Sequence, residues 1–573
     1  MILVPRERIE EFRAKGWWGS RTMAQLFLQN AADLPEREAV VDPSNKAALV
    51  GAAPRRLSYR ELSAEVGRMV ALMRAQGLRK DDVVVVQLAN GIEQYQVYLA
   101  CACLGVVVCP VPVQYREHEL DYVVSQTEAV VAITQQRIGR TAHAAMWTGL
   151  APRHATLRAI WVYGDEPPAG TLPLTALLAG TAPTPVADMH DPAVSADDVF
   201  TICWTSGTEA KPKGVPRSHN EWLIVGLSVK DAAELDDGAR VLNPFPFVNM
   251  AGISTGLASW LMLRGTVVQH HPFDFDVFLG QLRDEAVHYT IAAPALLNQL
   301  MQQPAKLEGI DFKRLSRIGS GSAPLSEWLV RGFAERYGVQ IINYFGSNEG
   351  AALSSTPGDL PDPAQRAAFF PRLGVSGYSW SAVNAPKVRT RLVDPDSGED
   401  IDEPGRPGEL RFAGATIFSG YFRAPELTAR AFDEQGFYRT GDLFEIAGDR
   451  KQFYRFVGRS KDLVIRGGMN ISSEEIENLA IGHPAIAEAA VVGWPDETMG
   501  ERVCVFAVLR AGHSLTLAEL VAYLREQCRV AAFKLPEHLI EIDALPRNPV
   551  GKVLKRDLRD EVARRAEAAR THP

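Results

Sequence analysis

The sequence predicts an α/β protein with a large N-terminal domain of stacked, mainly parallel sheets covered by helices, a small antiparallel subdomain and an α+β C-terminal domain. Three observations lead to this prediction. The chain has 573 residues, about twice the size at which one hydrophobic core stops growing, so at least two domains are expected. Short β-branched runs alternate with helix-length amphipathic segments from about residue 80, as in βαβ units. Beyond about residue 385 the runs become hairpin-like.

The strands expected in the large domain are apolar on both faces, as in a sheet covered by helices. A Pro- and Ala-rich stretch at about 165–195 divides them into two groups. The runs are VVVVQL from 83, VVVCPV from 106 and VVAIT from 130 before that stretch, and VFTICW from 199, TVVQHH from 266, HYTIAA from 288, RLSRIG from 314 and QIINYF from 340 after it. Helix-like sequence follows these runs, so we expect the strands to pair in parallel.

The last third of the chain changes pattern twice. The runs KVRTRLVDPDSGEDI, GELRFAG and FYRFVGR are punctuated by Gly and Asp-Pro, which predicts an antiparallel subdomain over about 385–460. A compact α+β pattern follows, with strands AAVVGW, RVCVFAVL and HLIEI between helical segments. We therefore predict an N-terminal domain over 1–460 and a C-terminal domain over 461–573.

Composition and charge argue against several classes of function. The chain is 46% hydrophobic and 23% charged, with a formal net charge of −8, and no block of like charge indicates nucleic-acid or membrane-surface binding. The six cysteines are scattered without CxxC spacing, so we expect reduced core residues instead of a zinc site or disulfides. No signal peptide and no apolar stretch of membrane-spanning length is visible, so we expect no membrane span and a cytoplasmic location.

The strongest local motif is WTSGTEAKPKGVPRSH at 204–219. It reads as a strand that ends in a loop of small hydroxyl and glycine residues with two lysines. Such a loop can hold phosphate groups, because Gly207 lets the backbone approach an oxyanion while Ser206, Thr208 and Lys213 offer hydroxyl donors and a positive charge. The spacing differs from that of a Walker A loop. Taken alone, such a segment is more often a loop without a ligand.

Six further motifs follow this loop along the chain. They are GSGSAPLS at 319–326, YFGSNE at 344–349, GELRFAGATIFSGY at 408–421, YRTGDL at 438–443, GRSKDLVIRGGMNISSEEIE at 458–477 and PRNPVGK at 546–552. In their order and residues, the motifs resemble those of the adenylate-forming superfamily, which contains acyl-CoA synthetases, peptide-synthetase adenylation domains and luciferases. The resemblance runs from about residue 20 to 565 and is closest to the acyl- and aryl-CoA ligases.

The resemblance implies ATP and Mg²⁺ as cofactors and names the catalytic residues. Glu349 would bind Mg²⁺ with Thr208, because a hard carboxylate suits a metal that bridges phosphate oxygens. Lys552 would stabilise the adenylation transition state, in which a carboxylate attacks the α-phosphorus and charge builds on the phosphoryl oxygens. Lys552, Thr208 and Glu349 are therefore the expected catalytic residues.

The nucleotide site implied by the resemblance draws on several motifs. Asp442 and Arg459 would bind the ribose, and Tyr344 or Phe345 would stack on adenine. The full ATP/AMP-binding set is Thr205, Ser206, Gly207, Thr208, Lys213, Ser320, Gly321, Ser322, Ala323, Pro324, Asn343, Tyr344, Phe345, Gly346, Ser347, Asn348, Asp442 and Arg459.

The resemblance also implies a mobile C-terminal domain. Adenylation and thioester formation need the same centre, first shielded and then open to a thiol, and the superfamily achieves this by rotation about a hinge. Lys461 matches the hinge position, where a few residues absorb a large change in backbone angles. Gly467 and Gly468 lie in the loop that would line the tunnel for coenzyme A.

The sequence departs from the superfamily pattern at several positions. Glu209 and Ala210 stand where Thr and Gly are usual in the phosphate loop, and Asn348 replaces a common Thr. Asn249 stands where amino-acid adenylation domains carry Asp, so a substrate ammonium would lack a carboxylate partner. The expected acyl pocket is otherwise apolar or small, which favours an aromatic, alicyclic or medium-chain acid. Its residues are Phe247, Asn249, Met250, Ser254, Ala292 and Ala351, beside Ser320.

These inferences predict an acid:CoA ligase that forms AMP, acting as a monomer or homodimer on a small carboxylic acid. One alternative is an acyl-AMP ligase that loads a separate carrier protein. Another is a non-catalytic nucleotide-binding paralogue, which Glu209 and Ala210 suggest and which the retained Lys552, Glu349 and Asp442 oppose. The PxxxxGK form at 546–552 also makes Lys552 a candidate site for a protein acetyltransferase, because acetylation would remove its charge.

Overall fold

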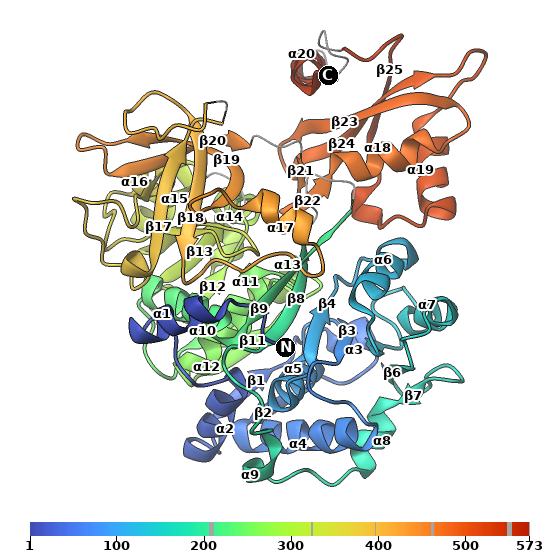
Figure 1. The fold of residues 1–573 in the computed structure, drawn as a ribbon, viewed down its shortest axis with the longest axis vertical. Coiled ribbons are helices and arrows are strands. Elements are labelled where there is room, and N and C mark those ends of the chain that lie inside the picture. Colours follow the sequence, from blue (N-terminus) through green and yellow to red (C-terminus); the bar gives the residue numbers. More distant parts are fainter. Residues whose placement is uncertain (206–210, 322–324, 396, 460–462, 547–552, 572–573) are drawn as a thin grey trace. The chain divides into compact units, whose positions relative to one another are not determined.

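The computed structural model describes residues 1–205, 211–321, 325–395, 397–459, 463–546 and 553–571. The chain forms two compact units, and Figure 1 shows their helices and strands coloured along the sequence. Unit 1 comprises 1–113, 124–204 and 214–458, and unit 2 comprises 114–123, 205–213 and 459–573. No helix in these described ranges is long and apolar enough to cross a membrane.

An eight-stranded sheet in unit 1 has the order β15-β14-β13-β12-β10-β11-β1-β2. Its interior pairs are parallel, and only the two edge pairs, β1–β2 and β14–β15, are antiparallel. The strands are β1 (Glu38–Val41), β2 (Arg56–Ser58), β10 (Arg240–Asn243), β11 (Thr266–Gln269), β12 (Tyr289–Ile291), β13 (Arg317–Gly321), β14 (Gln340–Gly346) and β15 (Ala352–Ser355).

A seven-stranded sheet has the order β7-β6-β5-β3-β4-β8-β9. The pairs from β7 to β8 are all parallel. The strands are β3 (Val83–Gln87), β4 (Val107–Pro110), β5 (Val131–Gln135), β6 (Ala159–Tyr163), β7 (Leu172–Pro173), β8 (Val199–Thr205) and β9 (Lys213–Ser218). A parallel sheet is covered on both faces, so the side chains on both sides of its strands are buried. The near-continuous apolar sequence of these strands suits this arrangement.

Helices provide that cover, and the largest hydrophobic cluster joins both sheets to them. Val84 and Val108 of one sheet and Val40 and Val267 of the other belong to this cluster, as do side chains of α2, α4, α5 and α10. Every residue of α5 is buried. The α-helices up to residue 431 are α1 (Arg6–Ala14), α2 (Met23–Asp33), α3 (Lys46–Val50), α4 (Tyr59–Ala75), α5 (Ile92–Leu104), α6 (Glu117–Thr127), α7 (His143–Leu150), α8 (Leu174–Gly180), α9 (Val186–Met189), α10 (His219–Ala232), α11 (Met250–Ile253), α12 (Trp260–Leu263), α13 (Phe275–Asp284), α14 (Pro294–Gln302), α15 (Glu327–Tyr337), α16 (Pro363–Ala368) and α17 (Pro425–Ala431). Of α6, residues 117–123 belong to unit 2.

A five-stranded antiparallel sheet completes unit 1, in the order β16-β20-β19-β18-β17. The strands are β16 (Phe369–Pro371), β17 (Val388–Val393), β18 (Gly408–Gly414), β19 (Tyr438–Ala447) and β20 (Phe453–Arg459). The Pro-rich stretch at 354–374 reads in sequence as a surface excursion, and this interpretation is wrong for residues 366–373, which are mostly buried. Strand β16 pairs with β20, and the side chain of Arg366 in α16 is fully buried.

The C-terminal part of unit 2 has its own sheet and hydrophobic cluster. The strands run β22-β21-β24-β23, and β25 pairs with β24 in parallel. They are β21 (Leu463–Arg466), β22 (Met469–Ser472), β23 (Ile486–Asp496), β24 (Gly500–Leu509) and β25 (His538–Glu541), with helices α18 (Ser473–Ile481), α19 (Leu517–Ala522) and α20 (Lys555–Thr571). The structure thus confirms the predicted fold class of large parallel sheets with small antiparallel ones.

Candidate active site

Two of the sequence motifs lie side by side at the end of the eight-stranded sheet. Strands β13 and β14 pair in parallel, with Ser320 opposite Asn343 and Gly321 opposite Tyr344. A side chain at Gly321 would not fit, because its Cβ would lie 2.5 Å from the carbonyl oxygen of Tyr344. The Oγ of Ser320 is buried and has no hydrogen-bond partner among the described residues. The predicted nucleotide motifs are therefore adjacent, as binding to one ligand requires.

The two aromatic residues proposed for adenine differ in their surroundings. Phe345 packs into the antiparallel sheet, with ring centroids 5.1 Å from Phe444 and 6.3 Å from Phe412. Both residues are partly exposed, and burial of the Tyr344 hydroxyl raises the pKa of that group above its usual range. Of the two rings, only that of Tyr344 is free of this aromatic cluster.

Glu349, in the loop after β14, is held from two sides. Its side chain is 7% exposed, and Oε1 accepts a hydrogen bond of 2.9 Å from the hydroxyl of Tyr421. Its carbonyl oxygen accepts a 2.9 Å hydrogen bond from the backbone N–H of Phe418. Both donors belong to the segment that follows β18. The GELRFAGATIFSGY motif therefore positions the acidic residue of the YFGSNE motif.

A third motif contributes to the same neighbourhood. Tyr438 begins β19, and burial raises the pKa of its hydroxyl well above its usual range, with a further rise from the negative charge of Glu349. Tyr421 and Asp442 also act on this hydroxyl. Asp442 is 8% exposed, and its backbone N–H donates to Oγ1 of Thr440 at 3.0 Å. The negative charges of Glu349 and Asp442, which the sequence predicts to serve the metal and the ribose, thus both act on the hydroxyl of one buried tyrosine.

Helix α11, which follows β10, is hydrogen-bonded to the loop after β14 that carries Glu349. Asn249 is the N-cap of α11, and its Oδ1 accepts a hydrogen bond of 3.1 Å from the N–H of Gly252. The next N–H, that of Met250, donates at 2.7 Å to Oδ1 of Asn348. A π-helical turn, Ser254–Ser259, continues α11, and such turns are frequent at functional sites.

The other residues predicted for the acyl pocket are dispersed. Phe247 is fully buried and packs edge-on against Tyr95 and Tyr98. Ala292 and Ala351 are also buried, each in a different hydrophobic cluster from Phe247. Ser254 is buried, whereas Asn249 and Met250 are only partly buried. Phe247 therefore belongs to the core, whereas the side chains of Asn249 and Met250 keep some exposed surface.

Several predicted residues lie outside the described part of the chain, namely Ser206, Gly207, Thr208, Glu209, Ala210, Ser322, Ala323, Pro324, Lys461 and Lys552, together with the side chain of Arg459. Thr205 ends β8 and Lys213 begins β9. Gly467 and Gly468 connect β21 to β22, where Arg466 pairs with Met469. Their φ angles are 55° and 79°, which a two-residue hairpin of this type needs at both positions.

Sequence reasoning missed Arg217 and Tyr421. Both occur within quoted motifs, GVPRSH and GATIFSGY, but neither was assigned a role. The available signal for Arg217 was a second basic residue, besides Lys213, in a short strand whose residues are all buried.

Mg²⁺ suits the donor that the site offers. The described residues contain no group of three or more His, Cys, Asp or Glu side chains that could hold a metal ion. Magnesium is commonly bound by one or two carboxylates, with phosphate and water as its other ligands. The buried Glu349 carboxylate pairs with no described Lys or Arg and accepts from Tyr421. A single hard oxygen donor beside the nucleotide motifs therefore fits this ion.

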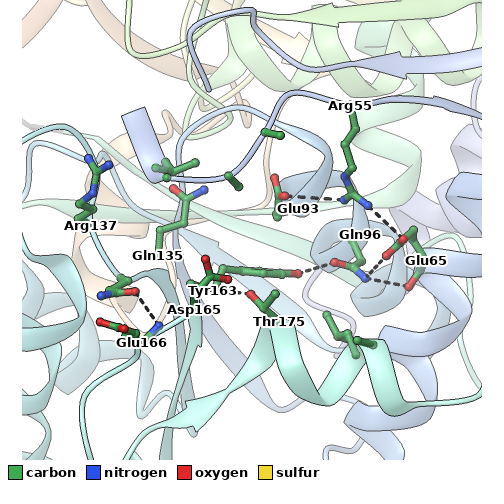
Figure 2. Close-up of a pocket in the computed structure, with 18 of the residues that line it drawn as sticks. Arg55, Glu65, Glu93, Gln96, Gln135, Arg137, Tyr163, Asp165, Glu166 and Thr175 are labelled. Atoms are coloured by element: carbon green, nitrogen blue, oxygen red, sulfur yellow. Dashed lines mark hydrogen bonds and ion pairs between the residues drawn. The ribbon is translucent and has the colours of Figure 1, made fainter. Parts of the chain in front are cut away.

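The cavity in Figure 2 lies elsewhere in unit 1. It has a volume of about 740 Å³ and is lined at the ends of β5 and β6 by Gln135 and Tyr163. The hydroxyl of Tyr163 donates to Oε1 of Gln96 at 2.6 Å, and Arg55 donates to Glu65 at 3.2 Å. None of the predicted site residues lines it. The cavity is therefore separate from the nucleotide motifs.

Comparison with known proteins gives two family matches. The family described as AMP-binding enzyme matches residues 27–422, and AMP-binding enzyme C-terminal domain matches 475–552. The medium-chain fatty-acid–CoA ligase of Escherichia coli (strain K12) is 31% identical, covering 98% of this chain and 94% of that protein. The salicyl-AMP ligase / salicyl-S-ArCP synthetase of Mycobacterium tuberculosis (strain ATCC 25618 / H37Rv) is 29% identical, covering 96% of this chain and 93% of that protein.

A solved structure resembles the fold at lower identity. The amide bond synthetase McbA from Marinactinospora thermotolerans superposes with a TM-score of 0.77 and 22% identity, over 94% of this chain and 99% of that one. At this identity the likeness concerns the fold alone.

Proposed function

Because the chain belongs to the AMP-binding enzyme family of adenylate-forming ligases, we propose that it activates a hydrophobic carboxylic acid with ATP and transfers the acyl group to coenzyme A. In the first step the acid's carboxylate attacks the α-phosphorus of ATP, forming acyl-AMP and releasing pyrophosphate. In the second, the thiol of coenzyme A attacks the acyl carbon and displaces AMP. A cytoplasmic location is part of this proposal.

The observation that carries the proposal is the placement of Glu349 beside the paired strands β13 and β14. Its buried carboxylate, oriented by Tyr421, would hold Mg²⁺, which would neutralise phosphate charge in bound ATP. Asp442 would accept hydrogen bonds from the ribose. Ser320 offers a buried hydroxyl with no described partner, available to the nucleotide. Lys552 would act on the transition state, as the resemblance implies.

The class of acid rests on the segment after β10. Asn249 and Met250 present amide and thioether groups, and Asn249 offers no carboxylate to pair with an ammonium. A buried, unpaired ammonium would be costly. We therefore propose an aromatic, alicyclic or medium-chain acid as substrate in preference to an amino acid. The similarity to a medium-chain fatty-acid–CoA ligase supports this range.

One alternative acceptor has specific support. A relative of similar coverage is named as both a salicyl-AMP ligase and a salicyl-S-ArCP synthetase. The same adenylation chemistry could therefore deliver the acyl group to a phosphopantetheine on a carrier protein.

The test uses the full chain with ATP, Mg²⁺ and a panel of aromatic, alicyclic and fatty acids. We expect acid-dependent ATP–pyrophosphate exchange without coenzyme A, and acyl-CoA with stoichiometric AMP when coenzyme A is added. Exchange that yields no acyl-CoA but acylates a carrier protein would favour the alternative acceptor. Absence of exchange with every acid, together with tight ATP binding, would contradict the proposed activity and favour a nucleotide-binding role.

A further inference from the structure

Arg217 is a buried cation whose hydrogen bonds go to backbone carbonyl groups. It lies near the end of β9, and its side chain has no exposed surface. Nη1 donates to the carbonyl oxygen of Asn348 at 3.0 Å, and Nη2 donates to those of Glu221 at 2.9 Å and Thr416 at 3.0 Å. No described Asp or Glu forms a salt bridge with it, and its Nε is buried without a described partner. The guanidinium therefore joins three segments that are distant in sequence.

Such a group is expensive to keep in a protein interior. Removing a charge from water costs several kcal/mol unless close partners compensate. Burial accordingly lowers the pKa of Arg217, while the charges of Glu221 and Glu349 oppose that shift. The guanidinium of arginine is planar and rigid, so, unlike the ammonium of lysine, it can fix the directions of several acceptors at once. The geometry at Arg217 thus suits a role in positioning backbone.

The backbone it positions is the one that carries Glu349. The carbonyl group before this residue, that of Asn348, accepts directly from Arg217. The residue after it, Gly350, has φ of 95°. An added Cβ at Gly350 would lie 2.7 Å from Nη1 of Arg217 and 1.8 Å from the carbonyl oxygen of Thr416. Glu349 therefore lies between a residue that bonds to the guanidinium, Asn348, and a residue beside which the guanidinium leaves no room for a side chain, Gly350.

We propose that Arg217 is a positioning residue for Glu349: its guanidinium fixes the loop after β14 against the segment after β18, and so sets where the carboxylate meets the metal. This inference rests on the proposed function, in which Glu349 holds Mg²⁺. Magnesium needs near-ideal octahedral geometry with ligands at about 2.0–2.1 Å. Groups that orient a metal ligand typically contribute roughly 10- to 100-fold in metal affinity or activity.

The chain offers a matched control in Arg366. Its side chain is also without exposed surface, and its donors also go mainly to carbonyl oxygens, with Nε bonding Ile341 at 2.9 Å and Nη1 bonding Leu360 at 2.8 Å. It contacts the start of β14, whereas Glu349 follows the end of that strand. Substituting Arg366 should disturb burial and hydrogen bonding to a similar degree without acting on Glu349.

The experiment compares Arg217→Lys with Arg366→Lys in the full chain. Lys keeps the charge but cannot span the same acceptors. Mn²⁺ binding in the presence of ATP, followed by electron paramagnetic resonance without any acid, measures the metal site apart from turnover. A Mg²⁺ titration of ATP–pyrophosphate exchange gives a second readout. We expect a 10- to 100-fold higher metal concentration for half-saturation in Arg217→Lys, and a change of less than about twofold in Arg366→Lys.

Equal shifts in the two variants, or no shift in Arg217→Lys, would overturn the positioning role. If Arg217→Lys does not fold, as thermal unfolding will show, Arg217→Gln is measured in its place against Arg366→Gln. A positioning role also predicts that Arg217→Lys adds little further loss of Mn²⁺ affinity to Glu349→Gln, since the two act as one unit. If the wild-type chain catalyses pyrophosphate exchange and Glu349→Gln binds Mn²⁺ as tightly as the wild type does, this role is refuted and the proposed activity is not. A wild-type chain without exchange would refute the proposed function itself.

Discussion

The hydroxyl of Tyr421 lies 2.9 Å from Oε1 of Glu349 and donates a hydrogen bond to it. Because the carboxylate is 7% exposed, this donor replaces part of the hydration that burial removes. The hydrogen bond occupies Oε1, so in the proposed function the other carboxylate oxygen, Oε2, would be the one to bind the metal. It joins two motifs separated by about seventy residues of sequence into one site.

Tyr421→Phe removes that donor and keeps the ring. Hydrogen bonds to charged groups are worth about 1.5–3 kcal/mol, so we expect roughly a tenfold or greater rise in the Mg²⁺ concentration needed for half-maximal exchange. A Mg²⁺ titration of ATP–pyrophosphate exchange measures this. Tyr454→Phe is the matched control, because Tyr454 is fully buried in the same hydrophobic cluster as Tyr421 and its hydroxyl bonds to that of Thr390. Equal effects of the two substitutions would contradict a specific role for Tyr421.

Lys552→Ala should slow adenylation by roughly 10²- to 10³-fold, the scale for removing one preorganised electrostatic donor. Thioester formation from preformed acyl-AMP should be affected much less, because that step does not develop the same phosphoryl charge. Single-turnover measurements of each half-reaction make the comparison. An equal loss in both would exclude a role confined to adenylation.

Asn249→Leu should change the ranking of acids more than the apparent affinity for ATP. A change of about a methylene in a pocket is worth roughly 1–3 kcal/mol in discrimination. Loss of the N-cap should also cost about 1 kcal/mol of stability. Asn249→Asp separates the two effects, because it keeps a capping oxygen and adds a charge that should disfavour carboxylate substrates. Altered ATP binding with an unchanged acid ranking would remove Asn249 from the acyl site.

Unit 1 should lose stability steeply below about pH 6. Burial lowers the pKa of His219 to about 3, of His270 to about 4 and of His271 to about 3. The unfolded chain binds these protons near pH 6.5, so folding opposes protonation between about pH 6.5 and 4. Above pH 6.5 the three histidines are neutral in both states and do not change the free energy of unfolding with pH. Below it each costs up to about 1.4 kcal/mol per pH unit, or roughly 4 kcal/mol per unit together.

Urea unfolding at pH 7.5, 6 and 5 measures this slope. His270→Gln should reduce this slope by about one third, because the unfolded chain then takes up two extra protons instead of three. His513→Gln, at an exposed position, is the control and should leave the slope unchanged. A slope that is the same in wild type and His270→Gln would refute the assignment.

The sequence predicted the strands best where β-branched residues were continuous. VVVVQL and VFTICW correspond to β3 and β8. Strands β1 and β2 are not predicted, because they precede the regular alternation that begins at about residue 80, and β1 owes its place to pairing with a distant strand, Val40 opposite Val267. No local pattern encodes a partner so far away along the chain.

The site divides in a similar way. The motifs predict Glu349 and Asp442 as site residues, and both carboxylates are buried in the structure and act on the hydroxyl of Tyr438. Arg217 could not be assigned, because its partners are carbonyl groups, which every residue has. Only the fold reveals that those of Asn348 and Thr416 converge on one guanidinium. The sequence also could not decide between Tyr344 and Phe345 as the ring that stacks on adenine. An aromatic residue at the end of a strand can pack in a core or against a ligand equally well.

The hydrogen bond from the N–H of Met250 to Oδ1 of Asn348 has a consequence for transplanting specificity between enzymes. A designer who replaces residues 249–259 with the corresponding stretch of a relative would change the proposed acyl side of the site and leave residue 348 unchanged. Any graft that shifts the first turn of α11 would then withdraw the donor from Asn348 and disturb the loop that carries Glu349. Residue 348 should therefore be exchanged together with the helix, as a single unit.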